Sequence, residues 1–216
     1  MIRKLILVML TMVFLVACQQ AEPASEAIVM TATPEPPGVM LEPEGLVQNI
    51  HDPVIAHEGD TYYVFSTGRR LPVICSKDKL TWESCGRVFE RNPAWTREVN
   101  ANLADIWAPD ISFFNDRWHL YYAVSSFGTQ DSAIGLATNA TLDPESPDFE
   151  WVDQGVVLRS HPGDRWNAID ANLVMDEHGE PWLNWGSFWN GIWMKKIDPA
   201  TGKFVEGDAD VIHLAD

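Results

Sequence analysis

Positively charged residues are scarce in this sequence. Its 216 residues include 15 Lys and Arg against 31 Asp and Glu, which gives a formal net charge of −16 at pH 7. Nucleic acids and anionic membrane surfaces bind proteins through basic patches, so this balance argues against both as partners. An acidic surface does not repel a neutral polysaccharide, which therefore stays an acceptable ligand.

Cysteine is also rare, with only Cys18, Cys75 and Cys85 in the chain. The last two fall on predicted neighbouring strands of an exported protein, where a disulfide is stable. Because the register of the strands is not visible in the sequence, two buried free thiols are the alternative. The His residues show no metal-ligand spacing such as His-Glu-x-x-His, so no metal site is predicted.

Long apolar runs are limited to residues 5–17, which are too few to span a membrane. Together with the basic start at residues 1–4, this run is typical of a secretory signal. Its end, Leu15-Val16-Ala17-Cys18, resembles the bacterial lipoprotein signal, in which the cysteine is lipidated. We therefore expect a lipoprotein signal peptide over residues 1–18 and an exported protein, either membrane-anchored through Cys18 or extracellular. An ordinary signal peptide is the alternative.

Residues 19–44 are rich in Pro, Ala and Glu and show no apolar periodicity. Glu35-Pro36-Pro37-Gly38 cannot join a regular element, because proline lacks the backbone donor. This stretch is interpreted as a tether that precedes a folded domain over residues 45–216.

A repeated unit organises that domain. An Asp precedes a β-hairpin at Asp52, Asp110 and Asp170, with a period of about sixty residues that is typical of propeller blades. Two further strands follow in the first two units, at residues 71–76 and 82–89, then at 132–138 and 151–158. The third unit continues through residues 192–197 and a turn at 198–203, and the chain ends in or just after a fourth strand. Residues 91–106 are predicted to form a loop.

Three blades do not close a propeller, which has about four to eight. We therefore expect the N-terminal part of a longer protein, with closure by oligomerisation or a complete small β-fold as alternatives. The chain contains ten Trp residues. Most of them are expected to pack in the core, and a few to line a sugar-binding groove.

Six segments occur in an order and spacing that together are highly specific. They are His51-Asp52-Pro53, Trp107-Ala108-Pro109-Asp110, Ser125 to Gly128 with Ser132 to Thr138, Trp151 to Gly155, Asn167 to Asp170, and Gly186 to Trp189. In this order they resemble glycoside hydrolase family 43, and most closely its endo-1,5-α-L-arabinanases. The resemblance implies an all-β, five-bladed β-propeller, of which about three blades are present here. It also implies an inverting glycoside hydrolase acting on α-1,5-arabinan or related arabinose- or xylose-containing glycans of the plant cell wall.

The resemblance also implies roles for the acidic residues. Asp52 corresponds to the general base, and Asp170 to the carboxylate that orients the general acid and raises its pKa by like-charge proximity. The family's acid is a Glu on the fourth blade, expected beyond Asp216, so this chain alone is expected to be inactive. Glu206 lies in a Gly-flanked turn and is not assigned that role. Ala171 stands where the arabinanases commonly have proline.

Other residues are expected to bind substrate or support the site. From the resemblance they are His51, Trp107, Asp110, Phe127, Gly128, Asn167, Ala168, Ile169, Ser187, Phe188 and Trp189. Asp110 could instead be a turn residue that hydrogen-bonds within its own blade. Trp107 and Phe127 could stack on arabinose or belong to the core. His51 is expected to fix local structure rather than to transfer protons.

The chemistry requires no cofactor, although a structural ion in the central channel of the full propeller is possible. Two other functions stay open. One is an arabinofuranosidase or xylosidase activity on the same fold, and the other is a non-catalytic glycan-binding lipoprotein.

Overall fold

The computed structural model describes residues 41–205 and 210–216. The chain divides into two units, residues 1–39 and 40–216, and the description below concerns the second. The predicted signal peptide, Cys18 and almost all of the predicted tether lie outside the described residues, as does Glu206. No helix in the described part of the chain is long and apolar enough to cross a membrane.

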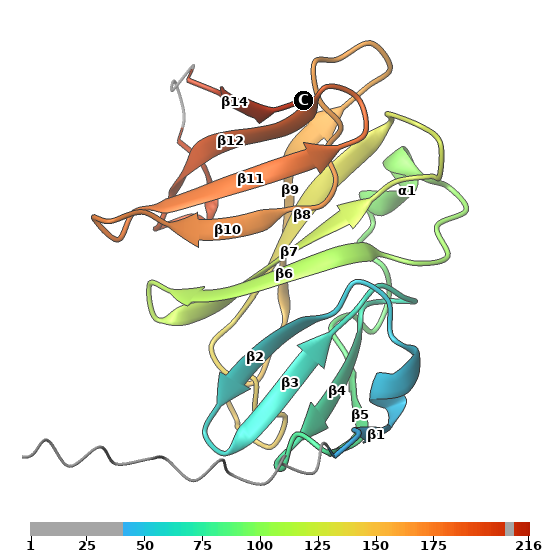
Figure 1. Cartoon of the computed structure of the whole chain (residues 1–216), viewed down its shortest axis with the longest axis vertical. Coiled ribbons are helices and arrows are strands. Elements are labelled where there is room, and N and C mark those ends of the chain that lie inside the picture. The colour runs from blue at the N-terminus through green and yellow to red at the C-terminus, as the bar shows by residue number, and fades with distance from the viewer. Residues whose placement is uncertain (1–40, 206–209) are drawn as a thin grey trace, which may run out of the picture. The chain divides into compact units, whose positions relative to one another are not determined.

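Three β-sheets follow one another along the chain (Figure 1). The first contains β1 (Glu44–Gly45), β2 (Val54–Glu58), β3 (Thr61–Phe65), β4 (Pro72–Ser76) and β5 (Thr81–Arg87), with the 3-10 helix η1 (Leu46–Asn49) after β1. The second contains β6 (Trp107–Phe114), β7 (Arg117–Val124), β8 (Ser132–Asn139) and β9 (Val152–Ser160). The third contains β10 (Asn172–Met175), β11 (Pro181–Ser187), β12 (Gly191–Asp198), β13 (Lys203–Phe204) and β14 (Ile212–Ala215).

Each sheet is built around an antiparallel meander in chain order, as the repeat predicts. The first hairpin turns at Gly59, whose φ of 61° is in the left-handed region that glycine adopts freely. The predicted third and fourth strands are present in the first two sheets. In the third sheet β14 pairs with β12, so a fourth strand at the end of the chain is also confirmed.

One predicted loop contains a helix. Within residues 91–106, the single turn α1 (Thr96–Val99) follows Pro93, whose carbonyl accepts hydrogen bonds from both the backbone and the hydroxyl of Thr96. A helix of one turn is too short to leave an apolar periodicity in the sequence, which is why it was not predicted.

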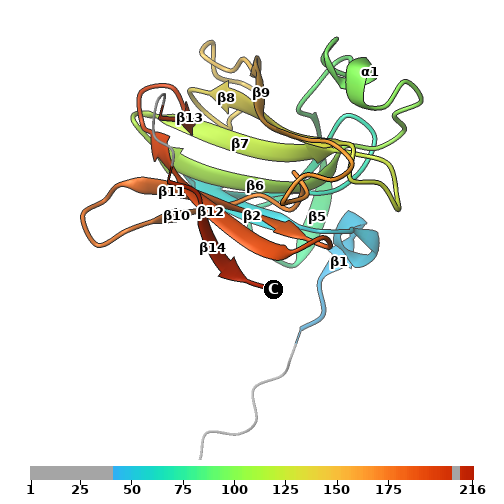
Figure 2. The same cartoon turned by 90° about the horizontal axis from the view of Figure 1, so that it is seen from above.

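The three sheets are consecutive propeller blades. The first strands of the hairpins, β2, β6 and β10, are neighbours in space, with β6 between the other two (Figure 1). The view from above shows the sheets stacked beside one another (Figure 2). The prediction of three blades is therefore confirmed.

Two apolar clusters join the blades. One packs the first sheet against the second around Phe65, Leu120 and Tyr122, and the other packs the second against the third around Tyr121, Leu136 and Trp185. Four Trp residues are buried, and three more pack against these clusters: Trp82, Trp118, Trp185 and Trp193, then Trp95, Trp151 and Trp166. The core-packing interpretation therefore holds for most of the tryptophans.

Covalent and polar links add to this packing. Cys75 on β4 and Cys85 on β5 form a disulfide with Cα atoms 5.8 Å apart. Glu58, at the turn of the first hairpin, joins two blades: its carboxylate accepts hydrogen bonds from Trp118 Nε1 (3.0 Å), Thr141 Oγ1 (2.8 Å) and Leu142 N (2.6 Å). Burial raises the pKa of Glu58, but these hydrogen bonds outweigh burial and leave the pKa below its usual value.

We expect Glu58→Gln to weaken the protein in a pH-dependent way. Because the folded-state pKa is depressed, the ionised group stabilises the fold above the ordinary glutamate pKa, and this contribution is lost as the pH falls through the folded-state value. The variant should lose about 1–2 kcal/mol at pH 7, since an amide accepts these bonds less well than a carboxylate. Urea unfolding of both proteins at pH 7 and pH 3 measures this. A difference of equal size at both pH values would contradict the assignment.

Candidate active site

The first candidate residue, Asp52, lies just before β2 in a backbone conformation with φ of 48°. Its Oδ2 atom is 2.7 Å from His51 Nδ1 and accepts a hydrogen bond of 2.7 Å from Thr67 Oγ1. The Oδ1 atom makes no hydrogen bond to any described residue, and 41% of the side chain is exposed. One carboxylate oxygen is thus fixed and the other is open to a water molecule.

Thr67 was not predicted as a site residue. Its hydroxyl donates to Asp52 and accepts from the backbone N–H of Ala108 at 2.8 Å, and its own N–H donates to the carbonyl of His51 at 2.9 Å. It therefore ties the start of the first blade to the start of the second. The hairpin pairing of β2 with β3 places it opposite Asp52, but the sequence carries no signal for the contact to Ala108.

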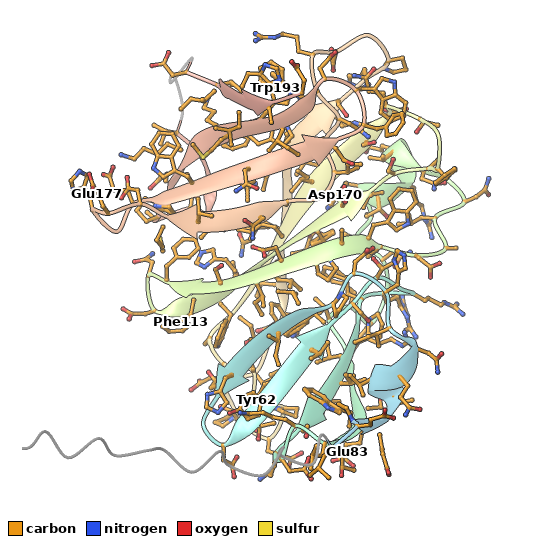
Figure 3. All side chains as sticks on the ribbon, viewed as in Figure 1. Tyr62, Glu83, Phe113, Asp170, Glu177 and Trp193 are labelled. Atoms are coloured by element: carbon orange, nitrogen blue, oxygen red, sulfur yellow. A yellow bond between two sulfur atoms is a disulfide. The ribbon has the colours of Figure 1, made fainter. Side chains whose placement is uncertain are left out.

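Asp170 lies in the corresponding position before β10 (Figure 3), with φ of 54°. Partial burial of its carboxyl group raises its pKa, and the negative charge of Asp52 raises it further. The neighbouring side chain of Ser187 acts in the opposite direction and lowers the pKa of Asp170. The two carboxylates that the resemblance singles out are thus near enough to interact electrostatically. They are 118 residues apart in the sequence and belong to the first and third blades.

The meander explains why these groups share one end of the blades. The first strands of the hairpins start at this end, so the loops between second and third strands return to it. These loops are residues 66–71, 125–131 and 188–190. In Figure 1 the starts of β2, β6 and β10 all lie on the right.

Aromatic rings stand exposed on two of these loops. Phe127 is 98% exposed and Phe188 75% exposed, while Trp189 is 36% exposed with its ring centroid 5.6 Å from that of Phe188. Trp107, at the start of β6, is half-buried. Phe127 is therefore not a core residue, so that alternative is wrong. Gly128 follows it in a left-handed turn with φ of 78°.

Asp110 has a different environment. It is buried, and its carboxylate accepts hydrogen bonds from Leu173 N (2.9 Å) and Asn172 Nδ2 (3.1 Å) on β10. The alternative that it bonds within its own blade is wrong: it links the second blade to the third. Burial raises its pKa, and the two hydrogen bonds oppose that effect.

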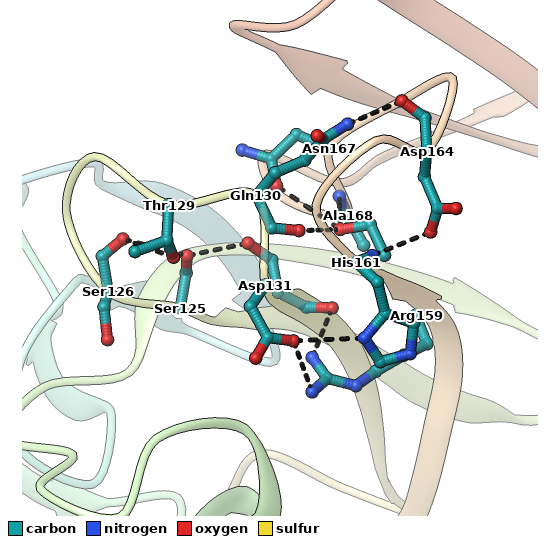
Figure 4. A network of polar contacts seen from close by, with 12 residues as sticks. Ser125, Ser126, Thr129, Gln130, Asp131, Arg159, His161, Asp164, Asn167 and Ala168 are labelled. Atoms are coloured by element: carbon teal, nitrogen blue, oxygen red, sulfur yellow. Dashed lines mark hydrogen bonds and ion pairs between the residues drawn. The ribbon is translucent and has the colours of Figure 1, made fainter.

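The segment before Asp170 is held by a polar network (Figure 4). The buried side chain of Gln130 donates to the carbonyls of Asp164 (2.7 Å) and Trp166 (2.9 Å) and accepts from Gly163 N (3.0 Å). Beside it, Asp131 pairs with Arg159 at 2.6 Å. Sequence reasoning missed Gln130, since a lone glutamine in a loop carries no pattern.

Asn167 and Ala168 are part of this same support. Both are almost fully buried, and the hydroxyl of Ser160 contacts Asn167 Oδ1 at 3.4 Å and accepts from Ala168 N at 2.9 Å. Their side chains support this segment from inside, and the contact with a sugar that the resemblance implies stays a prediction. Ile169 is half-buried, and its carbonyl accepts from Gly186 N at 2.9 Å.

The site contains no candidate metal centre among the residues that the structure covers. Nowhere in 41–205 and 210–216 do three or more His, Cys, Asp or Glu side chains form a group that could hold a metal ion.

Known proteins with similar sequences are named as an arabinofuranosidase and as arabinanases. The chain is 44% identical over 152 residues to an extracellular exo-α-(1→5)-L-arabinofuranosidase of Cellvibrio japonicus, a match covering 69% of this chain and 44% of that protein. It is 40% identical over 159 residues to extracellular endo-α-(1→5)-L-arabinanase 1 of Bacillus subtilis, covering 71% of this chain and 48% of the relative. The chain thus spans about half the length of the curated relatives it matches.

Solved structures agree with these relatives. The structure of Cellvibrio cellulosa α-L-arabinanase complexed with arabinohexaose matches with a TM-score of 0.70 and 42% identity, over 73% of this chain and 50% of that one. The family 43 endo-arabinanase of Bacillus licheniformis matches with a TM-score of 0.72 and 41% identity, over 80% and 58%. These neighbours are five-bladed β-propellers, which confirms the expected fold class.

The family model described as glycosyl hydrolases family 43 matches residues 46–215. This match includes all three blades, and with them both Asp52 and Asp170. The chain therefore belongs to glycosyl hydrolase family 43.

Proposed function

We propose that the protein hydrolyses α-1,5-linked arabinofuranosyl bonds of arabinan with inversion, through Asp52 and Asp170. The observation that carries this proposal is the position of Asp52 and Asp170, which precede the first strands of the first and third blades at the same end, where the charge of Asp52 raises the pKa of Asp170. The relatives support the proposal, because the names of two of them specify the α-(1→5) linkage of arabinose.

In this mechanism Asp52 is the general base. His51 and Thr67 hold one oxygen of its carboxylate, and the other oxygen takes a proton from water as the water attacks the anomeric carbon. An inverting enzyme needs about 6.5–9.5 Å between the base and the acid so that this water fits between them. The resemblance assigns the acid to a fourth blade, so we assign it to no residue of the three blades described.

Asp170 acts on the acid rather than on the water. A carboxylate near a carboxylic acid raises the pKa of that acid and keeps it protonated until the leaving oxygen takes the proton. Ser187, at the end of β11, favours the charged form of Asp170 by lowering its pKa. Phe127, Phe188 and Trp189 present flat apolar faces at the same end, where arabinose rings can stack.

Whether attack is internal or terminal is a finer question. An endo-arabinanase releases mixed oligomers first, whereas an exo-enzyme releases one short product from the start. We propose endo action, because the extended motif from Phe127 to Thr138 resembles that of the endo-arabinanases. Terminal attack stays the second candidate, because one relative is named an exo-arabinofuranosidase.

We also propose that the protein is exported and anchored through lipidated Cys18, with residues 19–44 as a tether that holds the domain away from the membrane. The two relatives named extracellular support export. Metabolic labelling with a palmitate analogue should mark the protein and not Cys18→Ala, and the variant should be released from the membrane fraction. A labelled variant would contradict the anchor.

The test of activity uses a substrate that needs no general acid. A 2,4-dinitrophenyl α-1,5-arabinobioside has a leaving group that departs without protonation, so base catalysis alone suffices. We expect the protein to hydrolyse it and to release arabinobiose first as the β-anomer, followed by proton NMR. Release of the α-anomer would contradict inversion. Binding of arabino-oligosaccharides without any hydrolysis would contradict the proposed activity and support the alternative of a non-catalytic glycan-binding protein.

A further inference from the structure

A pocket of about 700 Å³ has neither Asp52 nor Asp170 in its lining. Every residue that lines it belongs to the stretch from the loop after β3 to the loop after α1 (residues 69–105). The charged residues that line it are Arg69, Arg70, Arg91, Arg97, Glu90 and Asp105. We call it the arginine pocket.

The walls of the arginine pocket are well fixed. Gly68 exchanges two backbone hydrogen bonds of 3.0 Å with Ile106, and the carbonyls of Leu71 and Arg70 accept from Val88 N and Phe89 N. Arg70 and Leu71 both have positive φ, at 63° and 54°. Non-glycine residues hold such conformations only when their surroundings over-determine them, so this loop is a rigid support for its arginines.

The other wall is the turn α1, at the right of Figure 1 beside the loop ends. Asn100 closes this turn through its N–H to the carbonyl of Thr96 (2.9 Å), and its side chain donates to the carbonyl of Ser125 at the end of β7 (3.0 Å). Arg97 projects from a segment that is therefore tied to the second blade.

The charge of the pocket is opposite to that of the protein. The lining contains four guanidinium groups and two carboxylates, whereas the whole chain has a formal charge of −16. Among the described residues, the side chains of Arg69, Arg91 and Arg97 make no hydrogen bond or ion pair. Such donors are available to a ligand.

Two buried polar atoms in the lining also lack partners. Arg70 Nε and Asn92 Oδ1 are buried without a hydrogen bond in the described structure, although Arg70 NH1 donates to the carbonyl of Glu90 at 2.6 Å. An unpaired buried donor or acceptor costs about 1–3 kcal/mol. This is a second reason to regard the pocket as a binding site rather than a solvated surface.

We propose that the arginine pocket binds a uronic acid residue of an acidic glycan. The planar guanidinium fork matches a carboxylate in a bidentate manner, and the pocket volume is in the range that holds a small ligand such as one or two sugar rings. The position favours a glycan, because Arg69 follows Thr67 and Gly68, and Thr67 bonds to Asp52. The proposal rests on the proposed function only in taking the ligand to be a carbohydrate.

The acidic surface elsewhere does not prevent such binding. Charges are screened over about 8 Å at physiological ionic strength, so a ligand within the pocket interacts mainly with the arginines around it. The same argument predicts that binding weakens as salt is added.

Calorimetric titration with digalacturonate tests the assignment. We expect binding that weakens with NaCl, and a Kd at least tenfold higher for the double variant Arg69→Gln/Arg97→Gln. Arg117→Gln changes an exposed arginine at the start of β7, far along the chain from the pocket lining; it is the matched control and should leave Kd unchanged. Circular dichroism melting of each variant checks that the fold is retained.

Further ligands separate the outcomes. Inorganic phosphate that binds as tightly as digalacturonate would overturn the assignment to a uronate, and so would the absence of any digalacturonate binding or an unchanged Kd in the double variant. Arabinotriose should bind the double variant as it binds the original protein. If arabinotriose fails to bind either protein while digalacturonate binds, the proposed function fails and the arginine pocket stands.

Discussion

Asp52→Asn should reduce hydrolysis of the dinitrophenyl arabinobioside by about 10²–10⁴-fold, the usual contribution of a general base. The asparagine keeps the size of the side chain and an oxygen for Thr67, whose hydroxyl bonds to Asp52 at 2.7 Å. It cannot take the proton of the attacking water. Initial rates of dinitrophenolate release measure the effect, and the Kd for arabinotriose should change little.

The control for this variant lies at the other end of the same hairpin. Asp60, in the turn that follows β2, is an exposed carboxylate that pairs with Lys77 at 3.1 Å. Asp60→Asn should retain the rate within a factor of two, because nothing connects it to the reacting end. If both variants lose equal activity, or if Asp52→Asn retains it, Asp52 is not the base.

Asp110→Ala should destabilise the protein by about 2–4 kcal/mol. The change removes both acceptors for Leu173 N and Asn172 Nδ2, and leaves the backbone donor of a buried residue unpaired. For a chain of this size the loss corresponds to a Tm lower by about 4–16 °C. The contact joins the second blade to the third, so loosening of β10 should also move Asp170 and lower activity.

Two variants show whether the lost hydrogen bonds are the cause. Asp110→Asn keeps one oxygen acceptor and should lose less stability than the alanine variant. Glu150→Ala removes an exposed carboxylate of the loop before β9 and should stay within about 0.5 kcal/mol of the original. Scanning calorimetry of the three proteins gives the order, and equal Tm values for Asp110→Ala and Glu150→Ala would contradict the role of Asp110.

The blades could be predicted from the sequence because each leaves a repeated local signal. An Asp before an apolar run, a Gly or Asn turn and an aromatic strand recur at Asp52, Asp110 and Asp170, and the structure places each before or within the first strand of a blade. Period and turn chemistry are local properties, so one sequence suffices to reveal them.

The contacts between blades could not be predicted in this way. Glu58 and Asp110 both appear in the sequence as turn or strand-start residues, yet their carboxylates accept hydrogen bonds from the following blade. Thr67 and Gln130 likewise act through partners 41 and 34 residues away. Such partners depend on how whole sheets pack, and the periodicity of a single strand does not encode that.

The central claim is that Asp52 and Asp170 form one coupled site, and a carboxyl titration by NMR tests it most directly. The account predicts a pKa of Asp170 above the usual value in the original protein, and a lower pKa in Asp52→Asn because the neighbouring charge is gone. The pKa should be higher in Ser187→Ala because the Ser187 side chain favours the charged form. An Asp170 pKa that does not change when Asp52 is neutralised would contradict the coupling and the mechanism built on it.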